Sequence, residues 1–143
     1  MLKSLVVALV LFGAGPALAE PTGPDIEVEV TVIHATKGDA GVAPDLAPLG
    51  KYLLKSFAPY TTFTRLDHAT QRLAAGAEAR LALANKSELV YRHAGKVDGY
   101  FALHIEVGGL KSTVNVKDGK TFFQAGRAHG DGMIVLAFRV SGR

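Results

Sequence analysis

The chain has 143 residues, with sixteen Lys and Arg against thirteen Asp and Glu, which gives a formal net charge of +3. A chain of this length suits one domain, and because it contains no cysteine, that domain must rest on its hydrophobic core rather than on disulfides. The charges are scattered singly and form no basic stripe, so the composition does not favour a nucleic-acid partner.

The N-terminus has the pattern of a secretory signal peptide. Lys3 provides a basic start, Leu5–Phe12 is apolar, and Ala17–Ala19 is an A-x-A cleavage site. The apolar run is shorter than the ~20 residues that a membrane-spanning helix needs, and no cysteine follows it that could carry a lipid. We therefore predict a signal peptide over residues 1–19, export through the Sec pathway, and a single β-rich domain over residues 20–143. That domain would be periplasmic or secreted, with no stable membrane anchor after cleavage.

The first part of this domain predicts a linker, a strand and a helix. Glu20–Pro24 is a Pro- and Gly-containing linker that we expect to be mobile. Apolar and polar residues alternate in Ile26–Ile33, which predicts a strand whose charged face makes it a candidate sheet edge. Asp45–Phe57 is predicted as a helix that Asp45 can cap, with an apolar stripe that packs on the sheet. The stripe consists of Leu46, Leu49, Leu53 and Phe57.

Further strands follow in the middle of the chain. Tyr60–Leu66 is rich in strand-forming residues, whereas Ala69–Ala75 fits a helical turn or a weak strand equally well. Glu78–Ala84 and Glu88–His93 predict a hairpin, and Gly95-Lys96 predicts the turn that follows it.

Consecutive antiparallel strands fill the C-terminal part of the chain. Alternation predicts them at Val97–Val107, Leu110–Val116 and Thr121–Ala125. The Gly-Gly and Asp-Gly pairs between these segments are hairpin turn signals. Met133–Val140 is apolar on both faces except at Arg139, which predicts an interior strand that is covered on both sides.

Together these elements predict an α+β fold that is mostly antiparallel β. We expect a sandwich-like or strongly curved sheet of about eight short strands, with one short helix packed on it.

The segment Gly126–Gly132 is the best candidate for a ligand-binding loop. Arg127, His129 and Asp131 place a cation, an imidazole and a carboxylate between three glycines. Binding residues concentrate on exposed loops of rigid scaffolds, although a loop rich in Gly and Asp can also simply connect two neighbouring strands.

His104 and Glu106 form a second candidate, because side chains two residues apart on a strand share a face. That face can contact a ligand or can simply be solvated. The chain holds five histidines, which raises a metal hypothesis: His34, His68, His93, His104 and His129. They show no metal-ligand spacing and there is no thiolate, so the sequence leaves the question of a metal open. It predicts no cofactor.

No catalytic motif is present. The chain lacks G-x-S-x-G, H-E-x-x-H and a phosphate-binding glycine loop, so we predict no catalytic residue. A hydrolase with a dispersed site is the third hypothesis, after two binding functions.

Two resemblances accompany these patterns. Val114–Thr121 followed by Phe122–Gly126 resembles the hairpin near the end of the barrel core of the secretin family, although Gly126-Arg127 stands where that family has paired glycines. Secretins are far longer, and no function is carried over. The overall layout is similar to small exported bacterial β-rich proteins of uncharacterised function, which share the leucine-bearing helix before an F-x-x-Y stretch and a closing apolar strand. Here that stretch begins at Phe57 and ends at Tyr60.

The sequence favours a non-catalytic exported protein. The first hypothesis is a protein-binding or accessory module whose partner is another envelope or secreted protein. Its contact surface would be an exposed strand edge or an apolar patch, with Ile26–Ile33 as the candidate. The alternative is a periplasmic protein that binds a small molecule or a metal with the 126–132 loop and the pair His104 and Glu106. That alternative requires at least three of these side chains to converge.

Overall fold

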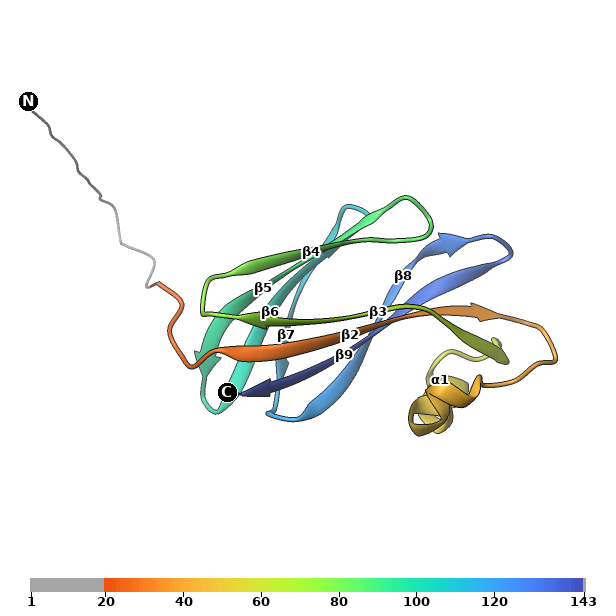
Figure 1. Cartoon of the computed structure of the whole chain (residues 1–143), viewed down its shortest axis with the longest axis horizontal. Helices are drawn as coiled ribbons and strands as arrows, with labels where there is room; N and C mark the ends of the chain where they lie inside the picture. Colours follow the sequence, from red (N-terminus) through yellow and green to blue (C-terminus); the bar gives the residue numbers. More distant parts are fainter. Residues whose placement is uncertain (1–19, 143) are drawn as a thin grey trace, which may run out of the picture.

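The computed structural model describes residues 20–142 as a two-layer β-sandwich with one short helix (Figure 1). Eight strands in this range form two antiparallel sheets, in the orders β3-β2-β9-β8 and β4-β5-β6-β7. The strands are β2 Ile26–Thr36, β3 Thr62–Leu73, β4 Glu78–Ala82, β5 Glu88–Val97, β6 Tyr100–Val107, β7 Leu110–Val116, β8 Lys120–His129 and β9 Gly132–Gly142. This architecture confirms the predicted fold class. The predicted signal peptide, at residues 1–19, lies outside the described residues.

Strand β9 is an interior strand that is covered on both faces, as its sequence predicts. It pairs with β2 on one side and with β8 on the other. Leu136 and Phe138 are fully buried in the core between the two sheets, whereas Val135 and Ala137 belong to a second apolar cluster under the helix. The double coverage explains why the segment is apolar on both faces.

Aromatic side chains contribute much of the core between the sheets. The ring of Phe138 stacks on Phe122 with centroids 5.0 Å apart, and it meets the ring of Tyr91 edge-on at 6.0 Å. Tyr91 comes from the opposite sheet, so these contacts join the two layers. Aromatic pairs of this kind add to the stabilisation that burial of their area provides.

The prediction that Ile26–Ile33 is an edge strand is wrong. Strand β2 lies between β3 and β9, with hydrogen-bonded neighbours on both sides. Alternation in a sequence reports that one face of a strand is buried, but it carries no information about the strand's two edges. The edges of this sheet are β3 and β8. Strand β3 is longer than predicted and resolves the ambiguity of Ala69–Ala75 as strand as far as Leu73.

The predicted helix is divided into two parts. Pro44–Leu49 is a 3₁₀ helix, termed η2, and Gly50–Ser56 is the α-helix α1. Pro48 lies inside η2 and supplies no amide donor, which disfavours regular α-helix there. Asp45 does not cap the helix; its carboxylate instead forms an ion pair with Arg65 at 3.3 Å.

The apolar stripe of this helical segment packs on the sheet as predicted. Leu46 and Leu53 are buried, and Leu49 and Phe57 pack against the same cluster, which also contains Val135. In Figure 1 the helix lies near one end of the sheet, beside the end of β2 and the start of β3.

The turn predicted at Gly95-Lys96 lies three residues later in the structure. Strand β5 continues through Gly95-Lys96 with an irregularity in its pairing, and the turn to β6 is made by Asp98 and Gly99. Both turn residues have positive φ, 53° and 84°, as the favoured two-residue hairpins require. The prediction of one strand over Val97–Val107 is therefore wrong at its start, because Asp-Gly acts there as a turn.

The linker Glu20–Pro24 was predicted to be mobile, but hydrogen bonds hold it on β5. The carbonyl of Thr22 accepts from the Lys96 amide at 2.9 Å, and the carbonyl of Pro24 accepts from Nε2 of His93, also at 2.9 Å. The Gly95 amide donates to Nδ1 of the same imidazole at 3.1 Å. His93 is fully buried, and both of its ring nitrogens are satisfied in the neutral form.

We predict that His93→Ala lowers the stability of the domain. The substitution removes two hydrogen bonds and leaves the buried Gly95 amide without a partner, which costs about 1–3 kcal/mol. Thermal unfolding followed by circular dichroism should show a lower Tm for this variant. Gln71→Ala, on the exposed edge strand β3, is the control and should unfold near the wild-type temperature. Equal Tm values for the two variants would contradict the role assigned to His93.

A second prediction concerns Tyr91, whose side chain is 1% exposed. Burial raises the pKa of its phenol above the ordinary value of 10.0, since burial disfavours the phenolate. The unfolded chain therefore loses this proton at a lower pH than the folded domain does. Stability should be intact below pH ~10 and should fall as the pH rises from there through the raised pKa.

Denaturant unfolding at a series of alkaline pH values measures this effect. Tyr91→Phe should lessen the alkaline loss of stability. No hydrogen bond to the Tyr91 hydroxyl is found within residues 20–142, so the same substitution should cost little at neutral pH. A variant as sensitive to alkali as the wild type would show that another group, such as a lysine, controls the loss.

Candidate functional site

The segment predicted as a binding loop is mostly strand. β8 extends to His129, and only Gly130 and Asp131 form the turn to β9. The pairing shifts between Ala125 and Ala128, so a bulge accommodates the glycine-containing part of the segment. The sequence signal was ambiguous because glycines serve loops and strand bulges alike.

The three candidate side chains of this hairpin do not form one cluster. Arg127 packs over the turn between β6 and β7, where a Cβ added to Gly108 would lie 2.7 Å from the Arg127 side chain. The His129 ring meets the His34 ring edge-on at 4.9 Å, and Nε2 of His34 donates to the His129 carbonyl at 3.1 Å. Asp131 is exposed in the turn.

His104 and Glu106 lie together on the outer face of the other sheet, as the alternation predicts. They line a shallow hollow of about 500 Å³, which none of the three residues of the β8–β9 hairpin lines. A terminal guanidinium nitrogen of Arg92 donates to Nδ1 of His104 at 2.6 Å, and Lys111 is the cross-strand neighbour of Glu106. The hydrogen bond between Arg92 and His104 therefore occupies one ring nitrogen of the candidate imidazole.

The side chains that were predicted to bind a metal do not lie together in the structure. Among residues 20–142, no three His, Asp or Glu side chains lie close enough to hold one metal ion. The closest imidazole pair, His34 and His129, offers two ligands at most.

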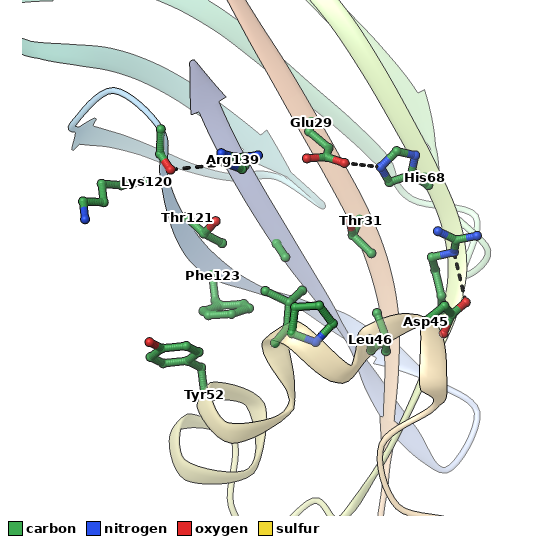
Figure 2. Close-up of a pocket in the computed structure, with 15 residues that line it drawn as sticks. Glu29, Thr31, Asp45, Leu46, Tyr52, His68, Lys120, Thr121, Phe123 and Arg139 are labelled. Carbon is green, nitrogen blue, oxygen red and sulfur yellow. Dashed lines mark hydrogen bonds and ion pairs between the residues drawn. The ribbon is translucent and has the colours of Figure 1, made fainter. Parts of the chain in front are cut away.

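A larger groove opens on the outer face of the sheet β3-β2-β9-β8, beside the helix. Its volume is about 680 Å³. Figure 2 shows the residues that line it, which come from the helical segment and from all four strands of the sheet. Leu46, Leu49 and Pro48 form part of an apolar wall on the helix side. Tyr52 of α1 is 59% exposed and lies near Phe123 of β8 in Figure 2.

The strand register places the polar residues of the groove in two rows. Glu29 of β2 is the cross-strand partner of Arg139 on β9, which in turn is opposite Thr121 on β8. In the next row, Thr31 of β2 lies opposite His68 on β3. Residues that are distant in sequence therefore share one sheet face.

Four of the acidic and basic side chains in the groove form two pairs with one another. Nε2 of His68 donates to the Glu29 carboxylate at 2.7 Å, and Arg65 pairs with Asp45 at 3.3 Å. Arg139 is different, since its Nε donates only to the Gly119 carbonyl, at 3.3 Å. Within the described part of the chain, neither Arg139 nor Lys120 at the rim forms an ion pair.

The groove contains groups that can bind a ligand. The hydroxyl groups in its lining are those of Thr31, Thr121 and Tyr52. His68 and Glu29 form an exposed dyad, and no hydrogen bond joins His68 to the hydroxyl of Thr31 or Thr121 in the described structure. The unpaired guanidinium beside aromatic and aliphatic side chains can instead hold an anionic, partly apolar ligand.

Local sequence patterns do not reveal this groove, although the sequence contains one signal of it. Arg139 is the single charged residue of the apolar strand Met133–Val140, and it lies where the helix no longer covers the sheet. A charge in a strand that is otherwise apolar on both faces marks a position where the cover ends. No family model, curated protein or solved structure matches the chain in the comparisons made.

None of the helices between residues 20 and 142 has the length and hydrophobicity that a membrane crossing requires.

Proposed function

We propose that this protein is an exported, non-catalytic module that binds another envelope or secreted protein through the groove beside the helix. The observation that carries the proposal is the groove itself. It combines an open apolar wall, the exposed ring of Tyr52 and a guanidinium without an ion-pair partner, Arg139, on a rigid sheet.

Several features of the groove suit a protein partner. Exposed aromatic and arginine side chains are enriched where proteins contact one another. Tyr52 of α1 is 59% exposed and lines the groove, whereas Leu53 of the same helix is fully buried. An exposed aromatic side chain beside a polar groove is typical of interaction surfaces.

Export is the first part of the proposal to test. The full chain, produced in a bacterial host, should lose residues 1–19, because the segment ending at Ala17–Ala19 has the pattern of a signal-peptidase site. Intact-mass measurement of the purified protein should give the mass of a chain that begins at Glu20, and fractionation should place it outside the cytoplasm. A cytoplasmic protein that retains Met1–Ala19 would contradict export.

The contact surface can be mapped by photo-crosslinking in cells of native origin. A photo-reactive amino acid in place of Tyr52 should crosslink to one specific protein, since this position lines the groove. The matched control is Leu110, which is exposed to nearly the same extent, 59% against 55%, but lies on the other sheet. Equal crosslinking at both positions, or none at Tyr52, would contradict the groove as the contact surface.

A further inference from the structure

From the charges and spacing in the groove, we infer that its occupant is an extended peptide segment with an apolar side chain two positions from an Asp or Glu. The inference rests on the proposed function and specifies the chemistry of the partner. The acid would lie on Arg139, and the apolar side chain would lie between Phe123 and Tyr52.

The acid-binding position follows from the hydrogen bonds of Arg139. Its Nε donates to the Gly119 carbonyl at 3.3 Å, which orients the guanidinium. No hydrogen bond to either terminal nitrogen occurs within residues 20–142, so both remain available. Two parallel N–H donors are the arrangement that binds a carboxylate in a bidentate manner. Thr121, directly opposite on β8, adds an exposed hydroxyl.

The negative charges of the groove do not occupy that position. Glu29 is the cross-strand neighbour of Arg139, yet its carboxylate is hydrogen-bonded to His68 instead. Asp45 is engaged by Arg65. Three Arg or Lys side chains line the groove against these two carboxylates, so the site retains an excess of positive charge before any contribution from His68. A cationic or neutral segment would leave the Arg139 guanidinium without an ion-pair partner, whereas an Asp or Glu side chain would form an ion pair with it.

The spacing between the two subsites matches an extended peptide. Phe123 and Thr121 are two residues apart on β8, and both face the groove. Positions two apart on a strand are separated by about 7 Å. An extended peptide lying along β8 and β9 presents its own residues i and i+2 on one side at that same spacing. One side chain can therefore reach the rings while the other reaches Arg139.

Amide shifts in two-dimensional NMR spectra can test this with short peptides. The test peptide is acetyl-Gly-Leu-Ser-Glu-Gly-amide, with two partners: one with Gln in place of Glu, and one in which Leu and Glu are adjacent. We expect the first peptide to bind about tenfold or more tightly than either partner, since the charge-assisted contact is lost in one and misplaced in the other. Shifts should concentrate at Thr121, Arg139 and Tyr52, and binding should weaken at high salt.

Variants of the groove provide the matched controls. Arg139→Gln should remove the preference for Glu over Gln in the peptide, and Arg139→Lys should retain part of it because the charge stays but the paired donors do not. Arg72→Gln changes an exposed arginine of strand β3 in the same sheet; Arg72 does not line the groove, and the substitution should leave binding unchanged. Tm measurements on each variant separate loss of binding from loss of fold.

Two results of the peptide titrations would overturn the inference. One is equal affinity for the Glu and Gln peptides, and the other is a preference for the Glu peptide that persists in folded Arg139→Gln protein. Oligogalacturonate that shifts the same amides through Arg139 while the peptides do not would also overturn it, in favour of an acidic polysaccharide. If Tyr52 crosslinks to a protein but the groove binds the Glu and Gln peptides equally well, the inference about the acid is wrong and the proposed function stands. Failure of both experiments would refute the proposed function as well.

Discussion

The structure depends on one constraint, which is that strand β9 must be covered on both faces. Leu136 and Phe138 can be buried only if the second sheet closes over one side, and Val135 and Ala137 only if something covers the other. The helical segment provides that second cover. It packs Leu46 and Leu53 onto the outer face of the first sheet, so two apolar clusters are built on the same strand.

The cover on the outer face is short, and the groove is a consequence of that shortness. Helix α1 has seven residues and lies beside one end of the sheet. Where it stops, the outward-facing residues of the strands change from apolar to polar: Ala137 is followed two positions later by Arg139, and Phe123 is preceded two positions earlier by Thr121. The groove therefore joins an apolar wall to a polar floor, which suits a ligand that carries both characters.

The two outer faces of the sandwich differ in what surrounds their arginines. On the second sheet, Arg92 stands in register between Glu78 and His104 and donates to the imidazole. On the first sheet, Arg139 stands in register between Glu29 and Thr121 and has a backbone carbonyl as its only hydrogen-bond partner in the described structure. Neither guanidinium forms an ion pair within residues 20–142, but only the groove at Arg139 is also lined by Tyr and Phe rings. An anion-binding group beside aromatic side chains suits a partly apolar ligand, which is why the groove, rather than the hollow at His104 and Glu106, carries the proposed function.

The sequence by itself determined the fold class and most strand positions, because alternation and turn chemistry are local properties. It identified the interior strand Met133–Val140, the helical stripe and the Asp118-Gly119 turn. It also noted Arg139 as an interruption without assigning it a role. Sheet order and edges were decided only by the tertiary structure, since pairing partners are not encoded in the period of a strand: Ile26–Ile33 proved to be interior. The groove was equally beyond local patterns, because its residues come from four strands and a helix that meet only when the sheet assembles.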